Sequence, residues 1–523
     1  MSATNLDAFK EAIEQGYTFK GDHFVLGGAM LDGQAVTNSL VKIPLMTLNR
    51  HGLIAGATGT GKTKTLQIIA EQLSAKGVPS LLMDIKGDLS GIAQPSGGHE
   101  KIDERHAMIG IPFQAGASPV ELLSLSDEPG VRLRATVSEF GPVLFSKMLD
   151  LNETQSGITA VAFKYADDSK LPLLDLKDFR KILQFLANEG KEEIEKEYGR
   201  ISSVSIGAIV RKLVELEQQG ADTFFGEPSF EVDDLLRIDE LGRGIVSVLR
   251  LTDIQDRPKL FSTFMLQLLA EIYSTFPEEG DLEQPKLVIF IDEAHLVFDE
   301  ATDALMDQLE AIIKLIRSKG VGIFFVTQNP SDIPEDILGQ LGLKIQHALR
   351  AFTAKDRKAI KLAAQNYPLT DFYDVEQILT ELGTGEAFVT ALDQKGRPSP
   401  LAHTLLRAPQ SRMDVLTKKE IKQLVDESRL VEEYNKSVDR ESAYEILSKK
   451  IEKAAAAEHQ EELAKQREKA GTSRRSSRRK EKSMFERIVN STTTRQIGRT
   501  VAREFTRGLL GVLGIKSTTR RRR

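Results

Sequence analysis

Hydrophobic positions along the chain follow two alternating patterns. Short continuous apolar runs, which predict buried strands, alternate with segments whose apolar residues recur at helical spacing. The predicted strands cover residues 51–57, 79–85, 244–251, 286–291, 321–327, 343–349 and 386–392. The predicted helices among them cover residues 62–76, 259–273, 302–317 and 355–364. This alternation is typical of an α/β fold around a parallel sheet, so we expect a core made of residues 51–94 and 244–410.

The segments outside this core show other patterns. Residues 1–50 predict a short leader with one amphipathic helix and three short strands, a truncated barrel-like element with too few strands for a complete β-barrel. Residues 95–243 predict a mainly helical insertion, with one early strand near residues 107–113. Residues 411–470 are rich in Lys, Glu and Ala and predict a charged helical region.

The charge of the chain is distributed unevenly. Residues 471–523 hold 16 Lys and Arg against 3 Asp and Glu, a net charge of +13, so residues 1–470 carry −19 of the total of −6. This basic tail is of low complexity, helical or disordered, and residues 484–515 have the pattern of one amphipathic helix. Such a tail is typical of a solvated arm, and a contact with nucleic acid or, more weakly, with an anionic membrane stays open.

The absence of Cys and of long apolar segments excludes several kinds of site and location. The chain has no Cys, which excludes disulfides, zinc–thiolate sites, iron–sulfur clusters and cysteine nucleophiles and fits a reducing compartment. The first residues lack the apolar region of a secretory signal, and no stretch of about 18 apolar residues is free of charge. We therefore expect a cytoplasmic protein without a transmembrane segment.

The strongest motif follows the first strand of the predicted core. Residues 56–63 read GATGTGKT, which matches G-x-x-x-x-G-K-[ST] between a strand and a helix. The glycines let the backbone point its N–H groups at phosphate oxygens, while Lys62 adds positive charge for the β- and γ-phosphates and Thr63 offers a hydroxyl to Mg²⁺. ATP and Mg²⁺ are therefore the expected ligands. The expected nucleotide-binding residues are Gly56, Ala57, Thr58, Gly59, Thr60, Gly61, Lys62, Thr63 and Lys64.

Polar residues also follow two later strands. Asp292 and Glu293 stand directly after the strand of residues 286–291, at the carboxyl end where open α/β sheets bind ligands. We expect Asp292 to hold Mg²⁺ and Glu293 to orient and deprotonate the attacking water. Gln328 follows the strand of residues 321–327 and is expected to contact the γ-phosphate or that water.

Together these motifs predict a P-loop NTPase with a RecA-like core. The separation of 230 residues between Lys62 and Asp292 disfavours a small-molecule kinase. The letters DEAH at 292–295 suggest a two-lobed helicase, but the next strand ends in VTQNP and no second α/β lobe precedes the arginine-rich sequence QIGRTVAR. An ABC-type ATPase is disfavoured because the letters LSG follow the second core strand, far from the place of a signature helix.

Longer stretches resemble the HerA/FtsK group of ring-forming, DNA-pumping ATPases, most closely its HerA-like bacterial branch. The matching segments are FVLGGAMLDG, IPLMTLNRHGLIAGATGTGKT, LLMDIKGDLSG, FIDEAHLVF and IRSKGVGIFFVTQNPSDIP. The resemblance implies a hexameric ring with ATP between subunits and an arginine supplied by the neighbour. The matching candidates are Arg350, Arg317 and, more weakly, Arg357. Asp84 matches an acidic residue near the nucleotide, and His51 matches a histidine that we expect to be structural.

The leading functional hypothesis is an ATP-hydrolysing, ring-forming DNA translocase or helicase. One alternative is a motor of the same fold that moves protein, which the acidic body slightly favours. Another is a nucleotide-dependent switch, which the truncated barrel-like leader favours. The leader of residues 1–50 is shorter than the N-terminal barrel on which HerA-type helicases dock a nuclease, which disfavours a nuclease partner.

Overall fold

The computed structural model describes residues 3–471 except 254–256, 281, 299–302, 437 and 439. The predicted basic tail and its helix at 484–515 lie outside the described residues. The chain forms two compact units. Of the described residues, the larger unit contains those of 3–134, 218–224 and 228–438, and the smaller unit contains those of 135–217, 225–227 and 440–471.

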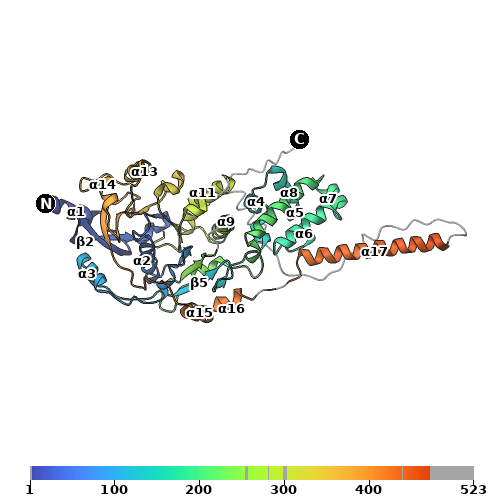
Figure 1. The fold of residues 1–523 in the computed structure, drawn as a ribbon, viewed down its shortest axis with the longest axis horizontal. Coiled ribbons are helices and arrows are strands. Elements are labelled where there is room, and N and C mark those ends of the chain that lie inside the picture. Colours follow the sequence, from blue (N-terminus) through green and yellow to red (C-terminus); the bar gives the residue numbers. More distant parts are fainter. Residues whose placement is uncertain are drawn as a thin grey trace. The chain divides into compact units, whose positions relative to one another are not determined.

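The larger unit is built on a twelve-stranded sheet (Figure 1). In spatial order its strands are β2 (Gln34–Pro44), β1 (His23–Leu31), β12 (Ala402–Leu406), β11 (Glu386–Thr390), β10 (Leu343–Gln346), β3 (Gly52–Ala55), β9 (Val321–Thr327), β8 (Leu287–Ile291), β4 (Ser80–Asp84), β7 (Val246–Arg250), β5 (Val120–Ser124) and β6 (Val131–Arg132). From β10 to β6 neighbouring strands are parallel, and from β10 to β2 they are antiparallel.

The parallel strands are apolar because the sheet is covered on both faces. Every residue of β3, β4, β8 and β9 is buried, as expected for strands between two helical layers. The helices of this unit are α1 (Ala3–Gly16), α2 (Lys62–Ala75), α3 (Glu100–Ile109), α9 (Pro258–Thr275), α10 (His295–Phe298), α11 (Asp303–Ile316), α12 (Glu335–Leu338), α13 (Ala354–Gln365), α14 (Val375–Glu381), α15 (Lys418–Glu427) and α16 (Arg429–Tyr434). All carboxyl ends of the parallel strands meet at one edge of the sheet.

The predicted leader belongs to this sheet. Its β-segments form one hairpin, in which Asp32 and Gly33 make the two-residue turn with φ of 51° and 75°. An Asp-Gly turn with both φ angles positive matches the right-handed twist of paired strands. The hairpin continues the sheet through β12, a strand that the hydrophobic pattern did not predict, and Tyr17 donates to the carbonyl of Val389 at 2.8 Å.

Residues 95–134 differ from the predicted helical insertion. The strand predicted near residues 107–113 is wrong, because residues 100–109 form α3. The side chain of His99 accepts a hydrogen bond from the N–H of Lys101 at 3.1 Å and caps this helix, and Gly110 ends it with φ of 83°. The strands β5 and β6 then extend the parallel sheet, so the helical unit begins only at Ala135.

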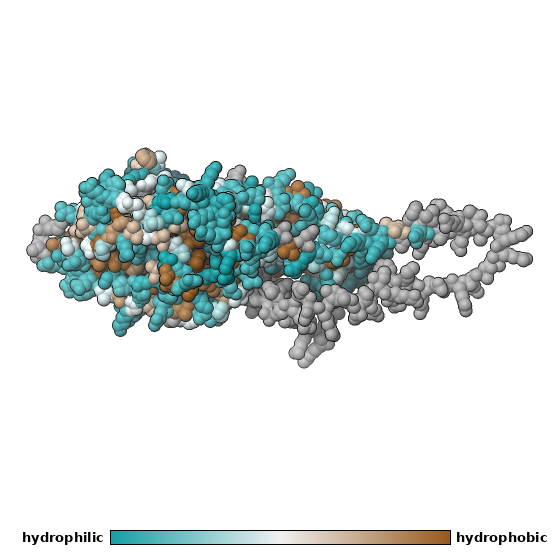
Figure 2. All heavy atoms as spheres, turned by 90° about the horizontal axis from the view of Figure 1, so that it is seen from below, coloured by the Kyte–Doolittle hydropathy of each residue, from teal (hydrophilic) through white to brown (hydrophobic). Residues whose placement is uncertain are grey.

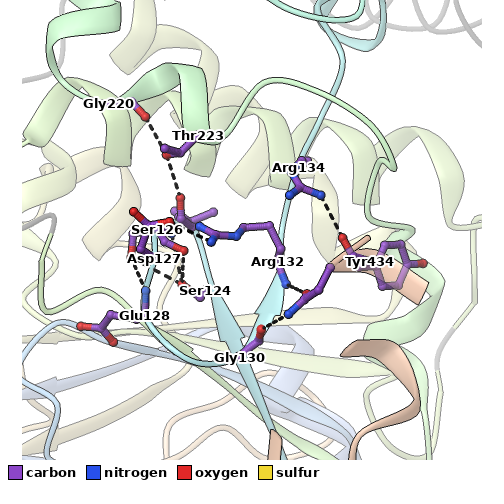
Figure 3. Close-up of polar contacts among 12 residues, drawn as sticks. Ser124, Ser126, Asp127, Glu128, Gly130, Arg132, Arg134, Gly220, Thr223 and Tyr434 are labelled. Atoms are coloured by element: carbon purple, nitrogen blue, oxygen red, sulfur yellow. Dashed lines mark hydrogen bonds and ion pairs between the residues drawn. The ribbon is translucent and has the colours of Figure 1, made fainter. Parts of the chain in front are cut away.

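The turn between β5 and β6 is held by side chains at the carboxyl edge of the sheet (Figure 3). Arg132 forms an ion pair with Asp127 at 3.0 Å, and Arg134 donates to the carbonyl of Tyr434 at 2.9 Å. The hydroxyl of Thr223 donates to the carbonyls of Gly220 and Leu125 at 2.7 and 3.3 Å. These contacts link the segment around β5 and β6 to residues 220–223 and to Tyr434 within the larger unit.

The smaller unit is helical. It contains α4 (Val137–Met148), α5 (Glu153–Ser169), α6 (Leu176–Ala187), α7 (Lys191–Glu197), most of α8 (Ser203–Gln218) and α17 (Ala443–Gly471), with α4 to α8 grouped side by side (Figure 1). Its core is aromatic, with the rings of Phe145 and Phe179 centred 4.8 Å apart. The carboxylate of Asp178 accepts the N–H of Tyr444 at 2.8 Å and anchors α17 on α6.

An extended segment of residues 410–416, which we call the strap, crosses α2. The buried carboxylate of Glu71 accepts hydrogen bonds from the N–H groups of Gln410 and Ser411 at 2.8 and 2.9 Å. Burial raises the pKa of Glu71, and the bonds from Ser411 and Gln410 oppose this. The strap therefore fastens the chain beyond the sheet to the helix that follows the phosphate-binding motif.

None of the helices among the described residues has the length and apolar character needed to cross a membrane. Hydrophilic residues cover most of the described surface visible in Figure 2, with hydrophobic atoms confined to limited patches.

Candidate active site

The phosphate-binding motif forms a tight loop between β3 and α2. Gly56, Gly59 and Gly61 have φ of 153°, 79° and 111°, a range that residues with a Cβ avoid. A Cβ on Gly56 would lie 2.5 Å from Cβ of His347, so this position has no room for a side chain. Gly61 precedes α2, whose first N–H groups face the loop. The loop and the helix amino terminus together form a site for phosphate.

Lys62 lies inside this loop. Its ammonium donates to the carbonyls of Gly56 and Ala57 at 2.7 and 3.2 Å. Burial lowers the pKa of Lys62, and the nearby Lys86 adds to this effect. Lys64, which was also expected to bind nucleotide, points elsewhere: its ammonium donates to the carbonyl of Met413 in the strap at 2.7 Å.

Backbone from distant strands supports the loop. The N–H of Gly385 donates to the carbonyl of Thr60 at 3.1 Å, and Arg105 donates to the carbonyl of Gly385 at 3.0 Å. On the other side, Nε2 of the buried His347 lies 2.9 Å from the hydroxyl of Thr65 in α2. Sequence reasoning missed Arg105 and His347, because only the tertiary structure brings these segments to the loop.

Asp292 and Glu293 stand at the carboxyl end of β8, one strand removed from β3. Asp292 is 2% exposed, and its Oδ2 atom has no hydrogen-bond partner among the described residues. Burial raises the pKa of Asp292 to about 7, against the lowering effect of Lys86. Glu293 has φ of 46°, and the next N–H, that of Ala294, donates to the carbonyl of Val326 in β9 at 3.0 Å. A left-handed glutamate at this place is a strained conformation held by the neighbouring strand.

Both carboxylate oxygens of Glu293 have polar neighbours. Lys86 forms an ion pair with Oε1. On the other oxygen, Oε2, Nε2 of Gln328 lies at 3.4 Å and Nδ1 of His295 at 3.3 Å. Burial alone would raise the pKa of Glu293, but the contacts with Lys86, Gln328 and His295 together hold the pKa below its ordinary value. The structure thus brings Gln328 to Glu293 at the ends of the neighbouring strands β9 and β8.

Lys86 is a site residue that the sequence pattern did not identify, and Asp84 explains its position. Asp84 Oδ1 accepts hydrogen bonds from the N–H groups of Gly87 and Asp88 at 2.7 and 3.1 Å, and Oδ2 accepts from Leu89 at 3.1 Å. Burial raises the pKa of Asp84 to about 6. Asp84 therefore shapes the loop that presents Lys86. The signal was available, since Lys86 closely follows a strand that ends at the same sheet edge.

Arg350 and Arg317 lie at opposite ends of the parallel strands. Arg350 follows β10 and lines an open cavity of about 690 Å³ together with Ala57, Thr58 and Gln328. Its guanidinium donates to the carbonyl of Thr380 at 2.9 Å. The cavity lies beside the phosphate-binding loop of the same chain.

Arg317 lies near the amino ends of the parallel strands, whereas this cavity lies at their carboxyl ends. It precedes β9 at its amino end, about 20 Å along the strand from Gln328. In its own chain Arg317 is therefore remote from the phosphate-binding loop. Arg357 lies on α13, the helix that follows Arg350.

His51 occupies the amino end of β3 and is structural, as predicted. Its Nδ1 accepts the N–H of Ile323 at 3.0 Å, and its Nε2 lies 2.9 Å from the carbonyl of Ile313, which it reaches as the donor. Burial lowers the pKa of His51 to about 4. The neutral imidazole thus fixes β3 against β9.

The residues present fit one Mg²⁺ ion. No group of three or more His, Cys, Asp or Glu suited to a metal occurs within the described part of the chain. Mg²⁺ commonly takes only one or two protein oxygens and completes its shell with phosphate and water. The free Oδ2 of Asp292 and the half-buried Thr63 offer such oxygens.

The fold and this site together define a P-loop NTPase with a RecA-like parallel core. The chain belongs to the helicase HerA-like C-terminal family, whose model matches residues 30–520.

Archaeal proteins are among the similar sequences. The chain is 24% identical over 359 residues to the DNA double-strand break repair helicase HerA of Sulfolobus acidocaldarius, covering 68% of this chain and 64% of that protein. It is also 24% identical over 377 residues to the protein of the same name from Pyrococcus furiosus, covering 67% of this chain and 65% of that protein. The chain thus spans a little under two thirds of the length of these relatives.

Among solved structures, the chain is similar to the bacterial conjugative coupling protein TrwBdeltaN70, at 14% identity and a TM-score of 0.49, covering 78% of this chain and 94% of that chain. VirB4 of Thermoanaerobacter pseudethanolicus is similar at 16% identity and a TM-score of 0.47, covering 75% of this chain and 98% of that chain.

Proposed function

We propose that this protein hydrolyses ATP and uses the cycle to drive a motor on DNA. The observation that carries the hydrolytic part is the meeting of three strand ends at one sheet edge. The loop after β3 supplies Lys62, β8 supplies Asp292 and Glu293, and β9 supplies Gln328 at 3.4 Å from Glu293. A phosphate cradle and a carboxylate base on parallel strands separated by one strand suit attack of water on a γ-phosphate.

In this mechanism the loop backbone and Lys62 hold the β- and γ-phosphates. The ammonium of Lys62 donates to the carbonyls of Gly56 and Ala57. It exchanges these carbonyls for phosphate oxygens when ATP binds. Glu293, held by Gln328, orients a water and accepts its proton. The water oxygen forms a bond to the γ-phosphorus while the bond from that phosphorus to the bridging oxygen breaks, giving ADP and inorganic phosphate. Asp292 and Thr63 would hold Mg²⁺, whose chemistry here is to neutralise phosphate charge.

The DNA track is supported by the family and by the names of the relatives, which are DNA repair helicases. We infer a homo-oligomeric ring, with a hexamer as the expected form, in which ATP binds between subunits. Arg350 lines the cavity beside the phosphate-binding loop and is the best placed of the candidate arginines to contact the γ-phosphate from its own chain. Arg317 is remote from that loop in its own chain and suits a contact made from a neighbouring subunit.

A motor on a protein track, or a nucleotide switch, is the second candidate. The observation in its favour is the net charge of −19 over residues 1–470, which contrasts with the positive surface that DNA contacts need.

Steady-state ATPase assays test the proposal. The rate should rise on addition of double- or single-stranded DNA and fall with salt, because phosphate contacts release counterions. Glu293→Gln should bind ATP and lose about 10²- to 10⁴-fold in turnover. Wild-type turnover in Glu293→Gln would refute the assigned base. Hydrolysis that needs Glu293 but ignores both forms of DNA would move the proposal to a protein track or switch.

A further inference from the structure

The ion pair between Lys86 and Glu293 is unusual for the site of a general base. The carboxylate that should take a proton from water is held on Oε1 by Lys86, while Gln328 and His295 face Oε2. An ammonium partner stabilises the charged carboxylate and weakens it as a base. In this arrangement Glu293 is therefore anchored, and Lys86 is the one lysine paired with it among the described residues.

The backbone places Lys86 next to the carboxylates. Strand β4 pairs with β8 in parallel, with Met83 opposite Ile291, so the residues that follow each strand emerge side by side. The three hydrogen bonds to Asp84 fix the base of the loop. Only the lysine stem is left to move, and 40% of the Lys86 side chain is exposed. A flexible four-carbon stem with a compact charge can exchange partners without a change in the backbone.

The charges around the site indicate which group could take Lys86 from Glu293. Lys62 and Lys86 are close enough for Lys86 to lower the pKa of Lys62, so both ammonium groups lie in one small region with Asp292 and Glu293. A γ-phosphate would add negative charge beside them and would compete with Glu293 for the lysine that can move.

We propose that Lys86 is a second phosphate-binding lysine, which leaves Glu293 for the γ-phosphate when ATP binds. This inference rests on the proposed ATPase function. The exchange frees Oε1 of Glu293 to accept the proton of the attacking water, and it puts a positive charge on the phosphoryl group that is transferred. ADP has no γ-phosphate, so Lys86 stays on Glu293 when ADP is bound. Lys86 thereby couples recognition of the triphosphate to release of the base.

Binding measurements on the full chain test this role without turnover. Dissociation constants for ADP and for a non-hydrolysable ATP analogue are compared in the wild type, Lys86→Met, Lys86→Arg and Lys76→Met. Lys76 is the matched control, since its side chain is 35% exposed and pairs with Asp22 at 2.7 Å, away from the site. We expect Lys86→Met to weaken analogue binding about tenfold with ADP binding unchanged, because a charge-assisted contact is lost. Lys86→Arg should restore most of the difference, and Lys76→Met should match the wild type.

Glu293→Gln supplies a second measurement that does not depend on the folding of Lys86→Met. Removing the carboxylate charge frees Lys86, so analogue affinity should rise in Glu293→Gln, and the rise should vanish in the double variant with Lys86→Met. An unchanged ratio of analogue to ADP affinity in Lys86→Met, or no gain in Glu293→Gln, would overturn the role of Lys86. If the wild type hydrolyses ATP and Glu293→Gln does not, the proposed ATPase function stands in either case. A wild type that neither binds nor hydrolyses ATP would overturn both.

Discussion

The two halves of the candidate site are held in place by different kinds of contact. The phosphate-binding half, around β3 and β10, is held by backbone: glycines at positive φ and the bond from Gly385 to Thr60. The carboxylate half, around β8 and β4, is held by side chains, with Lys86 on Glu293 and Asp84 shaping the loop. Backbone contacts fix a shape, whereas an ion pair with a long lysine stem can exchange its partners. The first half therefore holds phosphate, and the second half can respond to it.

The largest expected effect is that of removing Arg350, an arginine side chain that lines the cavity from the backbone-built half. Arg350→Ala should lower ATP turnover by about 10³-fold with nucleotide binding retained, because an arginine on the transferred phosphoryl group stabilises its charge. Mixing Arg350→Ala with Glu293→Gln distinguishes the two geometries. Recovery of activity in mixed rings would show that the arginine serves a neighbouring subunit. No recovery at any mixing ratio would favour action within one chain, as the position of the cavity suggests.

Gly56→Ala tests the rigidity of the backbone-built half. The new Cβ would meet Cβ of His347 at 2.5 Å at a position with φ of 153°. We expect about 100-fold weaker nucleotide binding and a loss of roughly 1–3 kcal/mol in unfolding free energy, the usual cost of overpacking. Gly59→Ala is the control, since Gly59 also has positive φ but a methyl group there would meet no atom within 4 Å. Equal losses in both variants would show that backbone strain, and not packing, is the limiting factor.

Acid should destabilise the backbone-built half through His51. Its pKa is about 4 in the folded chain against an ordinary value of 6.5, so the unfolded chain binds the proton more readily. The contribution of the neutral ring is complete above pH 6.5 and is lost as the pH falls toward 4, at about 1.4 kcal/mol per pH unit. Thermal unfolding between pH 7 and 5 measures the slope. The slope should be shallower in His51→Gln and unchanged when the exposed His99 is replaced by Asn.

The smallest effect is expected for Asp84→Asn in the side-chain-built half. The amide keeps one acceptor oxygen for Gly87 and Asp88 but cannot accept the N–H of Leu89. Loss of one such bond is worth about 1 kcal/mol, so we expect roughly fivefold slower turnover as Lys86 loses its fixed base. Asp393→Asn is the matched control, because Asp393 accepts the N–H groups of Lys395 and Arg397 in a distant turn. An equal effect of both substitutions on turnover would remove the link between Asp84 and the site.

The sequence predicted the parts of the site that follow from strand ends. Lys62, Asp292 and Gln328 each stand directly after or just beyond an apolar run, and parallel strands bring such residues to one edge. The same rule applies to Asp84 and Lys86. Their significance depends on the pairing of β4 with β8, which joins segments about 200 residues apart and leaves no local pattern in the sequence.

The wrong predictions of secondary structure have similar causes. The apolar residues near 107–113 suggested a strand, but the cap at His99 and the stop at Gly110 define a helix. Strands β5 and β6 were assigned to a helical insertion because short apolar runs fit either element, and only their pairing beside β7 identifies them. Local signals thus predicted element types where runs were long, and tertiary pairing determined the short ones.

The position of β3 in the sheet sets the order of events during synthesis. Its two neighbours are β9 and β10, so Gly52 pairs with Phe324 on one side and with Leu343 on the other. At about 5–20 residues per second, roughly 15 to 55 seconds pass on the ribosome between these segments. Through that interval the nascent strand and the helix after it have no native sheet to join. The segment that binds phosphate is made early and gains its strand partners late, so its apolar residues lack their native sheet neighbours through that interval.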